Sequence, residues 1–462
     1  MINNKIVFVS AGMLKNKKEH QSQQLYINYG FLNLASIVAN TGKHVAFFQG
    51  ENYDPSYIIQ LLEEQMLLNL KYPLFLSIPS YYAVEWAKQF IKLIKQINTE
   101  YKVVIGGRWV LSDEEWAVKN FNQTDVIVNG QAEDIIETLF SFSSDSKTPK
   151  YINNSKNTKG TSTFLLNYKV LHDYKKFSPS IELSRGCGFG CEFCADKDVP
   201  LSKAKEPTLL MQEIKNILDL YEEKQVNFYF ESSIFKPTAS WANEFCELYI
   251  KNNLKILWRC ETRADINLSE SILETLAKSG LKVFDVGLES ASFQQLKSMG
   301  KTLKPKQYLE QTSQFLKLCY KYDIWVKINI MFYPGETKNT IIETMNFLDK
   351  HKIYIKGISA YPMIIYGTDN YAKLFLNEIE RIGASAVNNK VENTGITELN
   401  LSNELSNQEA KLAAITISKR YMSVQDYYDL KSFNYFSRDY TYLDFKNHIK
   451  LLSNEKLPFN NF

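Results

Sequence analysis

Three cysteines occur within eight positions of one another, at Cys187, Cys191 and Cys194. Glycine alternates with them, and glycine adopts backbone angles that are closed to other residues, so this loop could wrap tightly around a compact ligand. Thiolates are soft ligands that suit iron–sulfur clusters or zinc. The pattern therefore predicts a metal centre, and the glycines that permit it are Gly186, Gly188 and Gly190.

The number of thiols distinguishes between these two metals. A structural zinc site uses four protein ligands, and the nearest further candidates, His172 and Cys246, do not have zinc-finger spacing. A 4Fe–4S cluster held by three cysteines instead leaves one iron open to a substrate. We expect a 4Fe–4S cluster at this loop, with a zinc site as the alternative.

The stretch from Arg185 to Cys194 resembles the signature of the radical S-adenosylmethionine (radical SAM) superfamily, and Phe193 occupies its aromatic position. The resemblance implies that the open iron binds the amino and carboxylate groups of S-adenosylmethionine (SAM). One electron then releases methionine and a 5′-deoxyadenosyl radical, which abstracts hydrogen from a substrate carbon. It also implies an electron donor such as flavodoxin or ferredoxin.

Three further stretches resemble the cobalamin-associated branch of this superfamily. Arg263 stands where the resemblance implies an arginine that pairs with the cofactor carboxylate, and a salt bridge with Asp265 is the alternative. Glu289 and Ser290 form a Gly-x-Glu-Ser-like turn that would face the cofactor. A buried ion pair for Glu289 and a helix cap for Ser290 stay open. The third stretch, Phe332–Thr337, resembles a structural turn of the branch.

Glu231 ends an expected strand at a position where relatives often carry aspartate. We expect it to make a polar contact with a cofactor or substrate.

The elements that must position these residues follow from the hydrophobic pattern. Short apolar runs alternate with amphipathic segments over the first 142 residues, which predicts a doubly wound parallel sheet. Its expected strands are Lys5–Ser10, Val45–Gln49, Leu74–Pro79, Val103–Gly107 and Asp125–Asn129. Its expected helices are Gly30–Thr41, Tyr57–Leu68, Val84–Ile97, Asp113–Asn120 and Ala132–Phe142.

The rest of the chain divides into three further parts. Polar residues 143–175 suggest a linker, 176–370 a partial (β/α)6 barrel, and 371–462 a small, mainly helical C-terminal domain. The expected barrel strands are Ser180–Leu183, Asn227–Glu231, Ile256–Cys260, Val283–Gly287, Trp325–Met331 and Gly357–Pro362. The expected barrel helices include Leu209–Tyr221, Trp241–Asn252, Leu268–Ser279 and Lys306–Tyr322.

In the branch, the N-terminal domain binds cobalamin. Gly106, Gly107 and Arg108 end an expected strand, where small residues could cradle the corrin and the arginine could serve its phosphate. The chain lacks the Asp-x-His-x-x-Gly motif. It has Arg108 near the position where relatives usually place a histidine, and Asn129–Glu133 departs from their Gly-Glu-Gly-Glu pattern. We expect cobalamin binding, and a relic domain that only shapes the cleft is the alternative.

The overall composition limits the classes of partner. The chain has 462 residues, 54 Lys plus Arg and 51 Asp plus Glu, so its net charge of +3 gives no reason to propose nucleic acid. It has no apolar run long enough for a membrane span, and we expect a cytoplasmic protein without a membrane partner.

The sequence therefore predicts a radical SAM enzyme, a cobalamin-dependent C-methyltransferase acting on a peptide or small metabolite. A cobalamin-free enzyme of epimerisation, cross-linking or cyclisation is one alternative, and a zinc-stabilised non-catalytic scaffold is another. The remaining cysteines, Cys246, Cys260 and Cys319, are expected to be buried, with a catalytic thiol at Cys260 left open.

Overall fold

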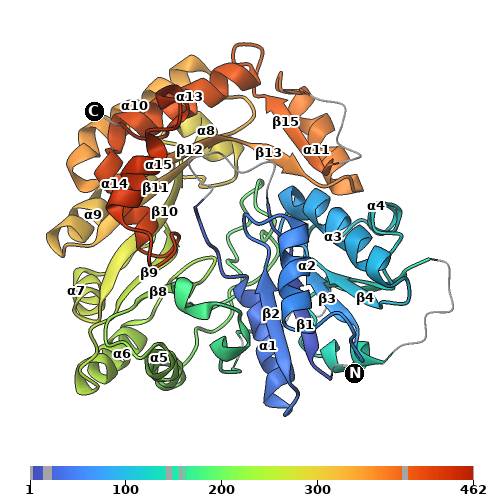
Figure 1. The fold of residues 1–462 in the computed structure, drawn as a ribbon. Coiled ribbons are helices and arrows are strands. Elements are labelled where there is room, and N and C mark those ends of the chain that lie inside the picture. The colour runs from blue at the N-terminus through green and yellow to red at the C-terminus, as the bar shows by residue number, and fades with distance from the viewer. Residues whose placement is uncertain are drawn as a thin grey trace.

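The computed structural model describes residues 4–13, 23–141, 148–155, 160–161, 163–387 and 394–460. The molecule is built around two parallel six-stranded sheets, and Figure 1 shows the N-terminal sheet beside a curved second sheet with helices on its outer side. The C-terminal helices pack on the second sheet.

The N-terminal sheet is doubly wound, as predicted. Successive residues of its first strand face opposite layers: Phe8 packs with helix α1, while Val9 packs with helices α2 and α3. The strand order is β2-β1-β3-β4-β5-β6, all parallel. The strands are β1 (Ile6–Ser10), β2 (Val45–Gln49), β3 (Leu74–Ser77), β4 (Val103–Gly106), β5 (Val126–Gly130) and β6 (Lys150–Asn154). The helices are α1 (Tyr29–Asn40), α2 (Pro55–Glu64), α3 (Val84–Ile97) and α4 (Glu114–Asn120).

Two expectations for this half of the chain are wrong. Strand β6 lies inside the segment expected to be a linker, and it was missed because a polar edge strand carries little hydrophobic alternation. The expected helix Ala132–Phe142 is instead a short 3-10 helix, Ile136–Phe140, with Phe142 outside the described residues. Its backbone hydrogen bonds connect residues three apart, as in the bond from Thr138 N to Ile135 O.

The second sheet is the predicted partial (β/α)6 barrel. Its order, β12-β11-β10-β9-β8-β7, follows the chain, so each strand pairs with its neighbour in sequence. The strands are β7 (Ser180–Glu182), β8 (Asn227–Glu231), β9 (Leu257–Arg263), β10 (Leu281–Glu289), β11 (Trp325–Phe332) and β12 (Gly357–Pro362). The helices are α5 (Pro207–Tyr221), α6 (Ala239–Lys251), α7 (Glu270–Lys278), α8 (Phe293–Ser298), α9 (Pro305–Lys321) and α10 (Lys338–His351).

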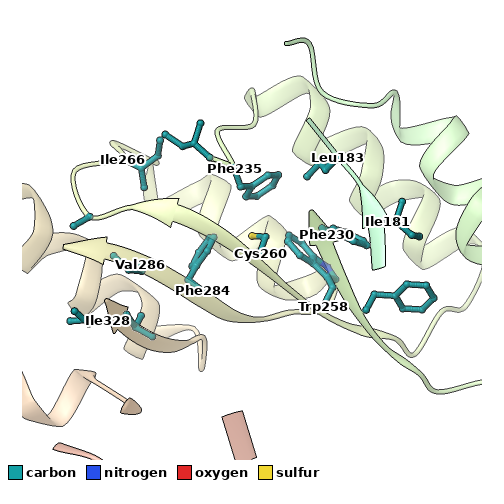
Figure 2. Packing of buried hydrophobic residues seen from close by; sticks show 14 of the residues in the cluster. Ile181, Leu183, Phe230, Phe235, Trp258, Cys260, Ile266, Phe284, Val286 and Ile328 are labelled. Atoms are coloured by element: carbon teal, nitrogen blue, oxygen red, sulfur yellow. The ribbon is translucent and has the colours of Figure 1, made fainter. Parts of the chain in front are cut away.

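Figure 2 shows the packing between this sheet and its helices. Trp258 stacks on Phe230 with ring centroids 4.8 Å apart, and Cys260 lies beside them and beside Phe284. Cys260 has no exposed surface, and burial raises the pKa of its thiol well above the usual value, so it is a core residue. Because side chains alternate along a strand, Arg259, next in sequence, belongs to the opposite face of the sheet, toward the barrel interior.

One part of the C-terminal region, helix α14 (Val424–Ser432), covers the end of the barrel at which the strands begin. Arg259 Nη1 donates a hydrogen bond of 2.6 Å to Leu430 O in α14, and Tyr427 packs in one cluster with Val283 near the start of β10. The region is mainly helical, as predicted, with α11 (Asn370–Glu380), α13 (Asn407–Tyr421), α14 (Val424–Ser432) and α15 (Tyr442–Ile449). It also holds an antiparallel sheet that was not predicted, of β13 (Ile364–Tyr366), β15 (Ile396–Asn400) and β14 (Ser385–Ala386). Among the helices of the described ranges, none has the length and apolar character needed to cross a membrane.

Candidate functional site

The cysteine loop follows β7 and closes on itself. The backbone N–H groups of Cys187 and Gly188 both donate to Val199 O, at 3.0 and 3.1 Å. The glycines at 186, 188 and 190 have φ angles of 74°, 74° and 70°, so the prediction that glycine is needed for its backbone freedom is confirmed. At Gly186 a Cβ would also lie 2.2 Å from Pro200 O.

Two of the three thiols accept hydrogen bonds from the protein. Cys191 is buried and receives a hydrogen bond from Arg263 Nη1 at 3.3 Å. Asp196 N donates to Cys194 Sγ at 3.4 Å. Burial raises the pKa of Cys187 and of Cys194 above the ordinary thiol value. A bound metal centre would supply the positive charge that stabilises these two thiolates.

Across the described ranges, no group of three or more His, Cys, Asp or Glu side chains is arranged around a single metal-ion position. The cysteine ligands of an iron–sulfur cluster bind different irons, so they lie farther apart than the ligands of one zinc ion. Within the described residues the three thiols do not surround one metal-ion position, and the 4Fe–4S cluster stays a prediction.

Arg263 fastens the cysteine loop to the barrel. Its Nε and Nη2 donate to the two carboxylate oxygens of Asp265, at 2.9 and 3.1 Å, and Nη2 also donates to Lys301 O at 2.8 Å. Its guanidinium carbon lies 4.0 Å from the centre of the Phe189 ring. The ion pair with Asp265 is present, but Arg263 is buried rather than on the surface. Pairing of Arg263 with a cofactor carboxylate stays a prediction.

In the turn after β10, Glu289 forms a buried ion pair, which is one of the two alternatives that the sequence left open for this turn. Glu289 Oε1 accepts a hydrogen bond from Lys301 Nζ at 3.1 Å, which makes a largely buried ion pair. Ser290 is buried, and its hydroxyl accepts from Ser292 N at 3.1 Å and lies 3.1 Å from Thr344 Oγ1. The position that caps α8 belongs to Ser292 and not to Ser290. Both hydroxyl contacts of Ser290 are thus within the protein.

A cavity of about 580 Å³ lies between the carboxyl edge of the N-terminal sheet and the ends of β7, β8 and β9. Ligands of doubly wound sheets bind at this edge. Among the residues predicted to contact cofactors, the structure brings four to the cavity wall: Gly106, Gly107, Arg108 and Glu231. The other four, Phe193, Arg263, Glu289 and Ser290, do not line it. Phe193 lies on the cysteine loop, its ring centre 5.9 Å from Lys301 Nζ.

Two glycines in the cavity wall have backbone angles that other residues also adopt, so glycine is not needed there for conformational reasons. A Cβ at Gly30, in helix α1, would meet nothing within 4 Å, and one at Gly106 would meet only Val128 O at 3.9 Å. Glycine inside a helix costs about 1 kcal/mol relative to alanine. The missing side chains keep the cavity open at these points, which suits a large planar ligand such as a corrin.

Arg108 makes a contact that differs from the one expected for it. Its Nη2 lies 3.1 Å from Asp196 Oδ1, so the guanidinium pairs with a carboxylate of the cysteine loop. Binding of a phosphate by Arg108 stays a prediction, and one of its guanidinium nitrogens already contacts Asp196. The sequence could not reveal the pairing, since the two residues belong to different domains.

Three carboxylates reach the cavity from adjacent barrel strands: Glu182, Glu231 and Glu261. Glu182 lies directly opposite Glu231 in the register of β7 and β8. Burial, reinforced by the two neighbouring carboxylates, raises the pKa of Glu231 to about 8. Burial also raises the pKa of Glu261, which accepts a hydrogen bond of 3.0 Å from Tyr229 Oη.

Sequence reasoning missed Glu182 and Glu261. The signal for both was an acidic residue near the carboxyl end of a barrel strand, at the functional edge of the sheet.

Comparison with known proteins finds a match over the second sheet. The model of the radical SAM superfamily matches residues 181–348. Over 166 residues the chain is 29% identical to the anaerobic magnesium-protoporphyrin IX monomethyl ester cyclase of Rubrivivax gelatinosus, covering 35% of this chain and 28% of the relative. Over 291 residues it is 24% identical to the bacteriochlorophyllide d C-8(2)-methyltransferase of Chlorobaculum tepidum, covering 58% and 61%. The chain thus spans less than two thirds of the length of these curated relatives.

Two solved structures share the fold over most of this chain. The radical SAM methyltransferase TsrM of Kitasatospora setae, solved with cobalamin and a 4Fe–4S cluster, has a TM-score of 0.66 at 13% identity, covering 90% of this chain and 88% of TsrM. The cobalamin-dependent SAM radical enzyme OxsB, solved with aqua-cobalamin, has a TM-score of 0.64 at 16% identity, covering 93% and 67%. At these identities the likeness establishes the fold.

Proposed function

We propose that the protein is a cobalamin-dependent radical SAM C-methyltransferase acting on a peptide or small metabolite. The premise is that residues 181–348, which match the model of the radical SAM superfamily, form a radical SAM domain. The observation that carries the proposal is the cavity of about 580 Å³, because it joins the carboxyl edge of the N-terminal sheet to the cysteine loop. A corrin at that edge would lie beside a cluster in the loop. The names of the relatives, which include a methyltransferase of bacteriochlorophyllide d, favour methyl transfer.

The residues present fit the three groups that this function needs. Cys187, Cys191 and Cys194 would hold a 4Fe–4S cluster, and the clear space beside Gly30 and Gly106 would take the corrin. When bound, the cluster, SAM and cobalamin supply an organic radical and a transferable methyl group.

The chain's own residues would hold the cysteine loop in place, donate a hydrogen bond into the cavity and exclude water from it. Arg263 donates hydrogen bonds to the Cys191 sulfur and to Lys301 O, and so connects the cysteine loop to the barrel. Glu231 keeps its proton at neutral pH, so it can donate a hydrogen bond into the cavity where an ionised carboxylate could only accept. Leu34, Phe75 and Ile136 make the deep wall of the cavity apolar.

The test is anaerobic reconstitution with iron, sulfide and hydroxocobalamin, followed by desalting. The absorption spectrum and the yields of methionine and 5′-deoxyadenosine from SAM under reductant are then recorded. We expect a broad cluster absorption, corrin bands that survive desalting, and SAM cleavage. Cys191→Ala should lose the cluster and the cleavage.

The matched control is Cys246→Ala, which removes a buried thiol from helix α6 rather than from the cysteine loop. It should behave as wild type. Cluster and cleavage without retained corrin would favour the cobalamin-free enzyme of epimerisation, cross-linking or cyclisation. A folded protein that takes up zinc and never forms a cluster would refute the proposal.

A further inference from the structure

Two ion pairs connect the N-terminal sheet to the cysteine loop. Arg108 Nη2 lies 3.1 Å from Asp196 Oδ1, and Glu133 Oε1 lies 2.8 Å from Arg185 Nη2. Arg185 also pairs through Nε with Glu182 at 2.8 Å. The side chains of the Glu133–Arg185 pair are only 16% and 13% exposed, so solvent screens this pair less than it would a surface pair.

The positions of these pairs relate them to both cofactor sites. Arg108 and Glu133 follow strands β4 and β5 and line the cavity. Their partners lie on either side of the cysteines: Arg185 comes two residues before Cys187, and Asp196 two residues after Cys194.

The opposite side of the loop is bonded to the barrel. Glu192 N donates to Met299 O at 3.1 Å, and Arg263 donates to Cys191 Sγ. The loop is thus held between the barrel and the residues that border the corrin cavity.

We propose that Arg108 and Glu133 are positioning residues that couple the cavity to the cysteine loop. Corrin seated against these side chains orders them, and through Asp196 and Arg185 they order the loop that holds the cluster. By thermodynamic linkage, a cluster in the loop must then strengthen corrin binding by the same factor. The inference rests on the proposed function, because it assigns the cavity to a corrin.

The experiment measures the dissociation constant of hydroxocobalamin for full-length protein with and without the reconstituted cluster. In wild type we expect a dissociation constant at least about fivefold lower when the cluster is present. Arg108→Gln and Glu133→Gln should reduce this ratio to below about twofold, because each breaks one ion pair. Arg108→Lys retains the charge and should retain most of the ratio.

The matched control is Lys95→Gln. Lys95 pairs with Asp125 at 3.2 Å within the N-terminal domain, with exposures of 19% and 13%. A residue that is only structural would change both dissociation constants alike and leave their ratio intact, which is the result expected of the control. The same result for Arg108→Gln and Glu133→Gln, or a wild-type ratio of one, would overturn the inference.

If wild type binds no hydroxocobalamin, the cobalamin assignment fails, and a second measurement decides the coupling. Amide hydrogen exchange of residues 186–201 is then followed in the cluster-free protein. The two Gln variants should exchange faster there than wild type and Lys95→Gln, because the loop has lost an anchor. Equal exchange would show that the ion pairs do not position the loop.

Discussion

Glu231 stands at the end of β8 with Glu182 opposite it on β7 and Glu261 reaching the same cavity from β9. Burial raises its pKa from the usual 4.5 to about 8. Between these values the unfolded chain ionises this carboxyl while the folded chain keeps it protonated. Stability therefore falls as the pH rises through that window, and the loss is complete above pH 8.

Glu231→Gln should remove this dependence, because a neutral amide replaces the group that must ionise. We expect the melting temperature of the variant to exceed that of wild type by at least a few degrees at pH 8.5, and to match it at pH 4.5. Thermal melts of both proteins across this range check the prediction. A difference that does not change with pH would contradict it.

Gly106 gives a test of the space in the cavity. Gly106→Leu should weaken hydroxocobalamin binding at least about tenfold, since its side chain would occupy volume that the fold leaves clear, and Gly106→Ala should have a smaller effect. Equilibrium dialysis with hydroxocobalamin measures the dissociation constants of both variants and of wild type. If the leucine variant binds as tightly as wild type, the corrin does not lie against β4.

The pairing of Arg108 shows where residue-level prediction stops. The glycines and spacing of the cysteine loop are local, so the sequence predicted the φ angles that the structure has. Asp196 lies 88 positions from Arg108 and on another domain, and only the packing of the two sheets brings the side chains together. The roles foreseen for Arg263 and Glu289 were incomplete for the same reason, because Lys301 contacts both.

At the scale of the element, backbone hydrogen bonds to Val199 O close the cysteine loop into a ring, and the shape of this ring depends on glycine. Gly186 and Gly190 have nearly the same φ, yet a Cβ would lie 2.2 Å from a backbone oxygen at Gly186 and would meet nothing within 4 Å at Gly190. The first position therefore adds a backbone collision to the ordinary strain of a left-handed residue, which is about 1–2 kcal/mol.

Gly186→Ala should lose most of its reconstituted iron, because Pro200 O cannot move without opening the ring. Gly190→Ala is the matched control and should keep most of its iron. Iron content after desalting, measured against folded protein, separates the two. Equal iron in both variants would mean that the ring tolerates the collision.

The buried strands of the two six-stranded sheets were predicted to within a few residues, because their apolar runs are distinct. Strand β6 was missed, since its Lys150-Tyr151-Ile152-Asn153-Asn154 sequence is half-exposed and mostly polar. The small sheet of β13, β14 and β15 was missed because its strands have only three, two and five residues, which is too short to show a pattern. Such strands depend on a neighbour for their stability, and that information is not local.

At the scale of the whole molecule, a buried ion pair connects the barrel to the C-terminal region. Arg259 and Asp285 are about 1% and 2% exposed, and Arg259 also bonds to α14 through Leu430 O. Burial alone would raise the pKa of Asp285, but Arg259 and Lys327 outweigh it and hold the pKa at about 2.

Asp285→Asn should destabilise the protein by about 3–5 kcal/mol, because it leaves Arg259 buried without its countercharge. Denaturant unfolding measures the loss. Asp323→Asn is the control: Asp323 pairs with Lys282 at 2.6 Å but is 85% exposed, so removing its charge should cost under about 1 kcal/mol. Similar losses in the two variants would contradict the argument from burial.

The second sheet ends at β7 on one side and β12 on the other, and within the described residues these two strands do not pair. A closed barrel has a diameter fixed by its strand number and stagger. An open one can widen by a shift of its terminal strands without breaking a hydrogen bond between neighbours. Over evolution, substitutions at those two edge strands can therefore change the size of substrate that the barrel accepts. The cysteine loop and the remaining strands can stay unchanged.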